Sequence, residues 1–171
     1  MACGGGVSCG ECAQCRAGRT NLCPDYWTAG IHRDGGLAQF CAVPASICEP
    51  TAPHGVDGDA VGLAQPMAIA VHSVRQGNLA EGERALVIGV GGIGAFATWA
   101  ASQSGAEVTI CDRDPDRLSV AARLGAAHSM LATGEPLLEL LADAGPWDVV
   151  YEMAGAEGPL LAALELVAPG G

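Results

Sequence analysis

Four cysteines lie close together near the start of the sequence, at Cys9, Cys12, Cys15 and Cys23, with the spacing C-x2-C-x2-C-x7-C. Four thiolates can surround one Zn²⁺ ion as a tetrahedron, and a closed four-thiolate shell leaves no open position for a substrate. The alternatives are disulfide bonds within the group and unligated thiols in a core. Because cysteines three residues apart are poorly placed to bridge one another inside a compact loop, the spacing predicts a structural zinc lobe.

A glycine-rich segment in the middle of the chain could bind a phosphate group. It matches G-x-G-x-x-G and comprises Gly89, Val90, Gly91, Gly92, Ile93 and Gly94. The first two glycines of the motif allow a tight turn and a close approach of the backbone to a diphosphate, and the last lets a helix pack against a strand. The N-terminus of that helix presents free N–H groups to the anion. The segment predicts a dinucleotide site; an S-adenosylmethionine site and a glycine turn without a ligand are the alternatives.

An acidic residue follows at the position where such a site needs one. Asp112 stands at the end of the next expected strand, where its carboxylate can accept hydrogen bonds from the ribose hydroxyls of adenosine. The same carboxylate would repel a 2′-phosphate, although the neighbouring Arg113 could tolerate one. The sequence therefore predicts NAD as the preferred cofactor, ahead of NADP.

The remaining segments supply the elements that would position these residues. Residues 1–60 are rich in glycine, proline and cysteine and contain short apolar runs such as 37–44, which we expect to be strands. A helical pattern follows over 60–76, after which strands and helices alternate. We expect strands at 84–88, 107–111, 128–131 and 148–152, and helices at 92–104, 115–124, 136–142 and 159–167. This alternation predicts an α/β fold with a parallel sheet covered on both faces.

The overall composition restricts the partners of the chain. With 8 Lys and Arg against 19 Asp and Glu the net charge is −11, so the surface repels phosphate backbones and we expect no nucleic-acid partner. The segment 85–106 has no charged residue, but glycines and polar side chains interrupt it, so we expect a strand, a turn and a buried helix rather than a membrane span. Since no charged segment followed by an apolar one opens the chain, we expect no secretory leader and a cytoplasmic protein.

The four cysteines outside the cluster have no ligand spacing. They are Cys3, Cys41, Cys48 and Cys111. Free cysteine is among the most buried residue types and packs as a small apolar side chain. We therefore expect these four thiols to be buried and to have no role in chemistry.

The order of the motifs resembles that of a known family. After the cysteine cluster come DGGLAQFCAVPAS at 34–46, AQPMAIAVHSV at 64–74, ALVIGVGGIG at 85–94 and CDRDPDRL at 111–118. In this order the chain resembles the zinc-dependent medium-chain alcohol and polyol dehydrogenases, nearest to the sorbitol, butanediol and threonine dehydrogenase branch. The resemblance implies a partial GroES-like catalytic domain over 1–60, which carries the structural zinc lobe, and an NAD-binding Rossmann domain over 61–171 that lacks its last strands.

The resemblance also implies roles for further residues. Arg117 would contact the adenosine ribose, and the segment made of Met153, Ala154 and Gly155 would lie beside the nicotinamide ribose. In this family a catalytic zinc polarises the oxygen of a secondary alcohol or polyol while a hydride passes to NAD. The family's ligands for that zinc come from a segment upstream of the cysteine lobe, and its next metal-associated position falls on Gln65, so the catalytic residues of this chain are unknown.

These departures from the family pattern lead to a further expectation. We expect the chain to be truncated at both ends relative to a longer parent enzyme and to be inactive alone. The parent is expected to be a homo-oligomer that takes a small-molecule alcohol or polyol. The alternative function is a non-catalytic module that binds NAD and zinc.

Overall fold

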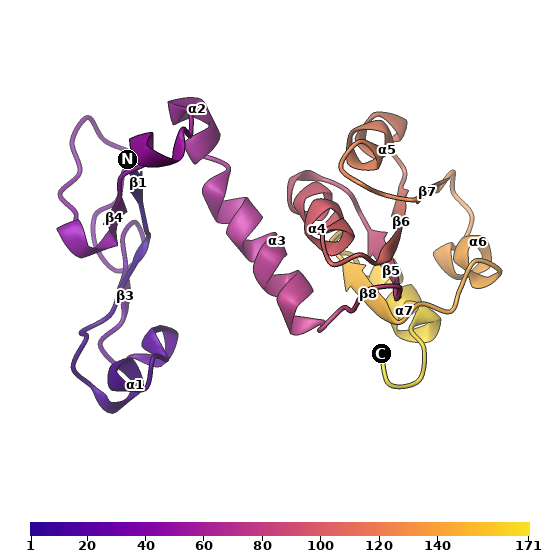
Figure 1. Cartoon of the computed structure of the whole chain (residues 1–171), viewed down its shortest axis with the longest axis horizontal. Coiled ribbons are helices and arrows are strands. Elements are labelled where there is room, and N and C mark those ends of the chain that lie inside the picture. Colours follow the sequence, from indigo (N-terminus) through magenta and orange to yellow (C-terminus); the bar gives the residue numbers. More distant parts are fainter. The chain divides into compact units, whose positions relative to one another are not determined.

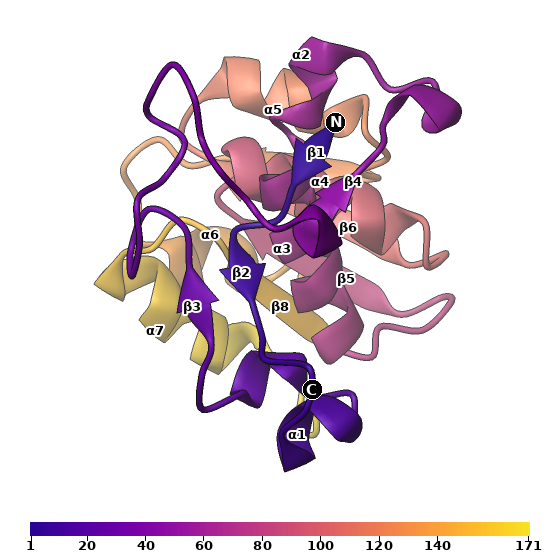
Figure 2. The ribbon, with the colours of Figure 1, turned by 90° about the vertical axis from the view of Figure 1, so that its left-hand side faces the viewer.

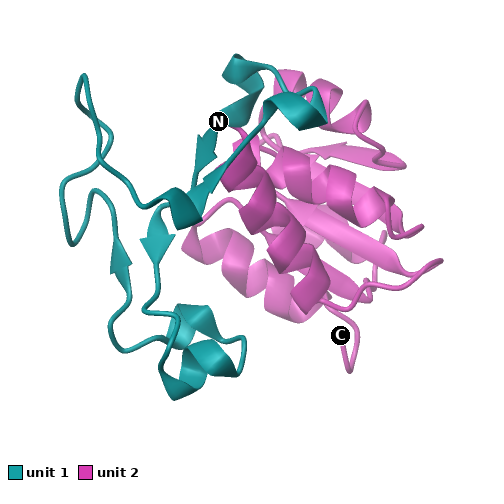
Figure 3. Ribbon diagram, turned by 60° about the vertical axis from the view of Figure 1, so that its left-hand side comes forward, with its two compact units in different colours: residues 1–62 teal, residues 63–171 magenta.

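The chain divides into two compact units. A computed structural model describes residues 1–171 (Figure 1) and separates Met1–Gly62 from Leu63–Gly171 (Figure 3). No helix in it is both long enough and apolar enough to cross a membrane.

The first unit contains two small antiparallel sheets joined by loops and single helical turns (Figure 2). Strand β1 (Ala2–Cys3) pairs with β4 (Cys48–Glu49), and β2 (Gly6–Val7) pairs with β3 (Trp27–Thr28). The helical elements of this unit are α1 (Ala13–Arg16), α2 (Gly58–Val61) and three 3₁₀ turns, Thr20–Leu22, Ala45–Ile47 and Ala52–His54. Strands of two residues bury little surface, so the stability of this unit depends on its loops and on what the loops bind.

Two expectations for the first unit are wrong. The segment 37–44 is a loop rather than a strand, and Leu37 and Phe40 expose 107% and 91% of their surface. An apolar run becomes a strand only where a partner strand takes its backbone hydrogen bonds, and this segment has none. The cysteines outside the cluster are not all buried either, because Cys3 and Cys41 are exposed and Cys48 is half-buried, whereas Cys111 is buried as expected.

The second unit is a parallel sheet with helices on both faces. Its strand order is β7-β6-β5-β8, and all neighbouring strands are parallel. The strands are β5 (Arg84–Ile88), β6 (Glu107–Asp112), β7 (His128–Leu131) and β8 (Val149–Glu152), and the helices are α3 (Ala64–Gln76), α4 (Gly92–Ser102), α5 (Pro115–Ala122), α6 (Leu137–Ala142) and α7 (Glu157–Leu166). The predicted α/β fold class is therefore confirmed.

The two cores of this unit follow from the alternation of side chains along β5. Ala85 and Val87 point to one face, where they pack with buried residues of α3, α4 and α5. Leu86 and Ile88 point to the other face, where they pack with α6, α7 and the fully buried Trp147. A strand buried on both faces is uniformly apolar, which explains why β5 has no polar alternation.

Candidate functional site

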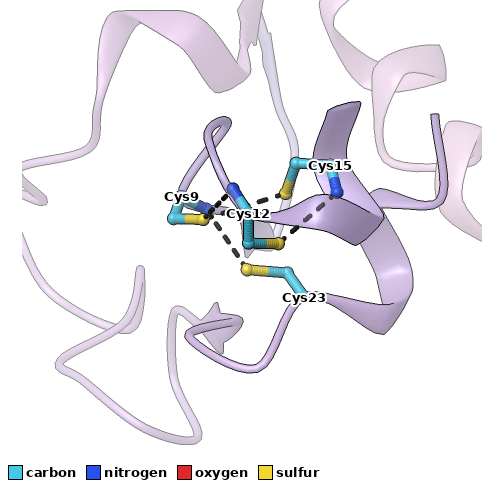
Figure 4. A group of neighbouring side chains, drawn as sticks. All are labelled: Cys9, Cys12, Cys15 and Cys23. Carbon is cyan, nitrogen blue, oxygen red and sulfur yellow. Dashed lines mark hydrogen bonds between the residues drawn. The ribbon is translucent and has the colours of Figure 1, made fainter. Parts of the chain in front are cut away.

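The four clustered cysteines come from three short segments of the first unit that turn around one point (Figure 4). Cys9 follows β2, Cys12 caps α1 by accepting a hydrogen bond from the backbone N–H of Cys15, and Cys23 ends the turn Thr20–Leu22. Gly10 is one of the glycines with positive φ that let this chain segment reverse direction, at φ +79.

The donor atoms of this cluster fit a zinc ion. All four Sγ atoms lie within 4.8 Å of one another, and those of Cys9 and Cys15 are 3.9 Å apart. A tetrahedral ion with Zn–S bonds of about 2.3 Å places its sulfurs about 3.8 Å apart. Backbone N–H groups of Cys12 and Cys15 each donate to the sulfur of the preceding cysteine at 3.4 Å, as Figure 4 shows. The arrangement therefore suits thiolates, which are the form that binds zinc.

The pKa of one thiol reflects the same backbone groups. The N–H groups of Glu11 and Cys12 stabilise the thiolate of Cys9 and lower its pKa to about 7, whereas burial and the contacts with Cys9 and Cys15 raise the pKa of Cys23 to about 11. Apart from Cys23, no residue of the segment 9–23 is buried. An apolar core does not hold this lobe together, and a bound metal can take that role.

The glycine turn lies at the carboxyl end of β5, where the sheet meets α4. Gly89 has φ +86, and a Cβ there would lie 2.7 Å from the backbone nitrogen of Ala154. A Cβ at Gly94 would collide with the carbonyl oxygen of Gly89, so both positions require glycine. Gly91 caps α4 without a side-chain hydrogen bond, and a Cβ there would have one neighbour, Arg117 Nη1 at 4.0 Å. The first N–H groups of α4 have no backbone acceptor, and the space beside Gly91 is open.

Asp112 links the glycine turn to the end of β6. Its side chain is only 8% exposed, and its Oδ2 atom accepts a hydrogen bond from the N–H of Val90 at 2.8 Å. Its Oδ1 atom accepts from the N–H of Asp114 at 2.9 Å. Each carboxylate oxygen can accept a second bond, so a hydroxyl group of a ligand can still bind here. Arg117, on α5, is held by an ion pair between its Nε atom and Asp114 Oδ2 at 3.4 Å.

The loop after β8 closes the other side of the turn. The N–H of Met153 donates to the carbonyl of Ile88 at 2.8 Å. The Oε1 atom of Glu152 accepts from the N–H groups of Ala154 at 2.8 Å and Gly155 at 2.9 Å. Glu152 was not predicted from the sequence; the available signal was an acidic residue at the end of a strand, three positions before a glycine. It fixes the loop that packs against the glycine turn.

These segments enclose one cleft of about 390 Å³ in the second unit. Six of the predicted cofactor residues line it: Gly89, Gly91, Asp112, Arg117, Met153 and Ala154. The other four, Gly92, Ile93, Gly94 and Gly155, do not line the cleft. These four residues form part of the backbone of the glycine turn and of the neighbouring loop. Such a cleft, with a helix N-terminus, a carboxylate and a guanidinium, can take a dinucleotide.

The structure brings no second group of metal ligands together. The cysteine cluster is the single place where three or more His, Cys, Asp or Glu donor atoms gather. Gln65 lies in the first turn of α3 and is exposed.

Comparison with known proteins finds a family match within each unit. The family model for the alcohol dehydrogenase GroES-like domain matches residues 1–53, and the model for the zinc-binding dehydrogenases matches residues 92–171. L-galactonate-5-dehydrogenase of Escherichia coli (strain K12) is 40% identical over 119 residues, which are 69% of this chain and 34% of that protein. L-threonine 3-dehydrogenase of Rhizobium rhizogenes is 36% identical over 156 residues, 89% of this chain and 45% of that protein. The chain thus spans less than half the length of these two relatives.

Solved structures agree with the sequence comparison. A zinc-binding dehydrogenase of Sinorhizobium meliloti 1021 bound to NADP matches with a TM-score of 0.85 and 29% identity, over 99% of this chain and 51% of that one. A protein of E. coli CFT073 described as a short chain alcohol dehydrogenase (rspB), complexed with NADH, matches with a TM-score of 0.83 and 29% identity, over 98% and 50%. The shared fold covers both units.

Proposed function

The chain belongs to the zinc-dependent medium-chain alcohol and polyol dehydrogenases, and on this basis we propose that it serves an oxidoreductase that transfers a hydride from a secondary alcohol or polyol to NAD. The observation that supports the proposal is the presence, in one chain, of a four-cysteine cluster whose donor atoms fit one metal ion and of a cleft lined by the glycine turn and Asp112. The family models that match both parts do not favour a methyltransferase or a non-catalytic binding module.

Each residue of the cleft has a proposed part in holding the cofactor. When bound, NAD supplies the carbon that accepts the hydride. The backbone N–H groups at the start of α4 would bind the diphosphate, and Asp112 would accept hydrogen bonds from the adenosine ribose hydroxyls. Arg117 would contact the same ribose, and the loop of Met153, Ala154 and Gly155 would support the nicotinamide ribose. Zinc bound by the four cysteines would hold the lobe and take no part in the reaction.

The charge of the cleft favours NAD over NADP. The carboxylate of Asp112 is nearly buried, and a 2′-phosphate placed beside it would be repelled at short range. Arg113 and Arg117 also line the cleft, and Arg117 is already paired with Asp114, so their positive charges reduce the preference without removing it. We therefore expect both cofactors to bind and NADH to bind more tightly than NADPH.

The names of two relatives suggest the substrate class. They place the oxidised hydroxyl on carbon 5 of L-galactonate and on carbon 3 of L-threonine, which are both secondary alcohols carrying polar neighbours. We propose that the whole protein takes a small polar secondary alcohol or polyol. A homo-oligomeric assembly and a cytoplasmic location remain predictions.

The test uses the purified full chain, zinc analysis and thermal unfolding. We expect one zinc ion per chain and a rise in melting temperature with NADH that exceeds the rise with NADPH, because a ligand that binds the folded state stabilises it. A rise with S-adenosylmethionine and none with NADH would point to a methyltransferase and end the proposal.

Turnover separates an enzyme from a binding module. Because the four-thiolate site has no open position, we expect this chain alone to oxidise neither L-threonine nor a polyol. Joining the family's upstream ligand segment to the chain should create alcohol oxidation with NAD. A folded, zinc-loaded and NADH-binding extended protein that stayed inactive would favour the binding module.

A further inference from the structure

Two cysteines outside the zinc cluster face each other across the small sheet of the first unit. Cys3 of β1 and Cys48 of β4 are paired in register, and their Sγ atoms are 3.6 Å apart. Both are free thiols; Cys3 is exposed and Cys48 is half-buried. Neither is among the four residues whose donor atoms meet at the cluster.

The backbone between them has the geometry that a disulfide bond needs. The N–H of Gly4 donates to the carbonyl of Ile47 at 2.7 Å, so that pair is hydrogen-bonded and the adjacent pair, Cys3 and Cys48, is not. Non-hydrogen-bonded pairs in antiparallel sheets have Cα atoms about 4.5 Å apart, within the range of about 4.4–6.8 Å seen for disulfides. The two sulfurs, now 3.6 Å apart, would approach to about 2.05 Å in the bond.

The other thiols outside the cluster lack this combination. Cys41 is exposed, but no sulfur lies within hydrogen-bonding distance of it. Cys111 is buried in the second unit, where burial raises its pKa to about 11 and protects it from oxidants. Exposure and a sulfur partner therefore coincide at one position outside the zinc cluster.

We propose that Cys3 and Cys48 form a reversible disulfide bond by exchange with small-molecule disulfides such as oxidised glutathione. The thiolate of Cys3 attacks one sulfur of the oxidised glutathione, forms a mixed disulfide and releases the first glutathione thiolate. The thiolate of Cys48 then attacks the Cys3 sulfur and releases the second. The two cysteines lose two protons and two electrons, and oxidised glutathione is reduced to two molecules of glutathione.

The order of the two attacks follows from the surroundings of each thiol. Cys3 is exposed, so the incoming disulfide can reach it. The pKa of Cys48 is raised by its hydrogen bond to Cys3 and by burial, which makes this thiol the poorer first nucleophile. The product would close a loop from residue 3 to residue 48 that contains the whole zinc lobe and ties β1 to β4.

The experiment equilibrates the zinc-loaded full chain with about 1 mM glutathione at a range of reduced-to-oxidised ratios. Two thiols fixed in one fold have an effective concentration on the order of 10 mM or more, so the internal disulfide should exceed the mixed disulfide about tenfold. After acid quenching and alkylation in denaturant, two of the eight cysteines should escape alkylation while zinc content stays unchanged. Trypsin cleaves first after Arg16, so the tryptic peptide with Cys3 also contains three of the clustered cysteines. Thermolysin, which cleaves before Val7, releases a peptide in which Cys3 is the single cysteine.

Matched variants assign the bond. Cys41→Ser should form the disulfide as the unaltered chain does, because Cys41 has no partner. Cys48→Ser should instead accumulate glutathione at Cys3, because the second attack is then impossible. Full alkylation of Cys3 and Cys48 under oxidised glutathione, a mixed disulfide that never closes, or oxidation confined to the zinc cluster with loss of zinc would each overturn the proposal. The unaltered chain gives this result by itself, so the conclusion does not depend on how well the variants fold.

Discussion

Replacing Gly91 by alanine should separate cofactor binding from stability. The backbone at Gly91 has φ −64 and ψ −161, which alanine adopts without strain, and the nearest atom to an added Cβ is 4.0 Å away. The free energy of unfolding should therefore stay the same or rise by about 0.4–1 kcal/mol, because alanine restricts the unfolded chain. The same methyl group would project into the cleft that Gly91 lines.

The loss of affinity can be worked from the contacts that the methyl group would displace. A diphosphate held against this backbone accepts charge-assisted hydrogen bonds, each worth about 1.5–3 kcal/mol. Losing one of them weakens NADH binding about 10- to 100-fold. A fluorescence titration with NADH measures the dissociation constant, and urea unfolding of the same samples measures stability.

Two neighbouring glycines provide matched controls. Gly92→Ala keeps the backbone N–H at the start of α4 and adds its methyl group to open space outside the cleft, so binding and stability should both be kept. Gly94→Ala places its Cβ against the carbonyl of Gly89 and should destabilise the second unit by more than about 2 kcal/mol. If Gly91→Ala bound NADH as tightly as the unaltered chain, the diphosphate would not lie against this turn and the placement of the cofactor would be wrong.

Three further predictions concern other parts of the chain. Cys12→Ser should lower the zinc content below one ion per chain and expose the segment 9–23 to proteolysis, because only Cys23 is buried in that segment. Mass spectrometry of the digest measures the cleavage, and one zinc ion per chain in the variant would contradict the prediction. Glu152→Ala should weaken NADH binding about tenfold by releasing the two N–H groups of the loop after β8, while Glu152→Gln, which keeps an acceptor, should weaken it less in the same titration. Tyr151 donates a hydrogen bond to the carbonyl of Val74 at 3.2 Å, and its pKa is raised to about 12 by burial and by the charge of Glu83. A raised pKa favours the neutral phenol in the folded state, so its contribution to stability should be complete below pH 10 and disappear as the pH rises toward 12; in urea unfolding at pH 7 and pH 10.5, Tyr151→Phe should show the weaker dependence on pH.

Much of the second unit could be predicted because its signals are local. The strand at 84–88 has the predicted bounds, since a short apolar run followed by a glycine is a strong pattern. The strand at 128–131 also has them, because the alternation of strands and helices places one there. The loop at 37–44 could not be predicted, because whether an apolar run is a strand depends on a partner elsewhere in the chain. The same reason hid the pairing of Cys3 with Cys48, which are 45 positions apart.

The candidate site divides along the same line. The spacing of the four cysteines and the glycine motif led to groups that the structure brings together. The part played by Glu152 depends on two backbone N–H groups folding back onto its carboxylate, and residue types alone do not encode that contact.

The separations of these contacts along the chain bear on the order in which the first unit folds. The four thiolates of the lobe span fifteen residues, whereas β1 meets β4 across 45 positions. Closing the shorter loop costs less chain entropy, so capture of the ion can nucleate this unit before its distant strands meet. During synthesis the lobe would leave the ribosome well ahead of β4. The supply of zinc while the lobe emerges would then set the rate at which the folded first unit accumulates.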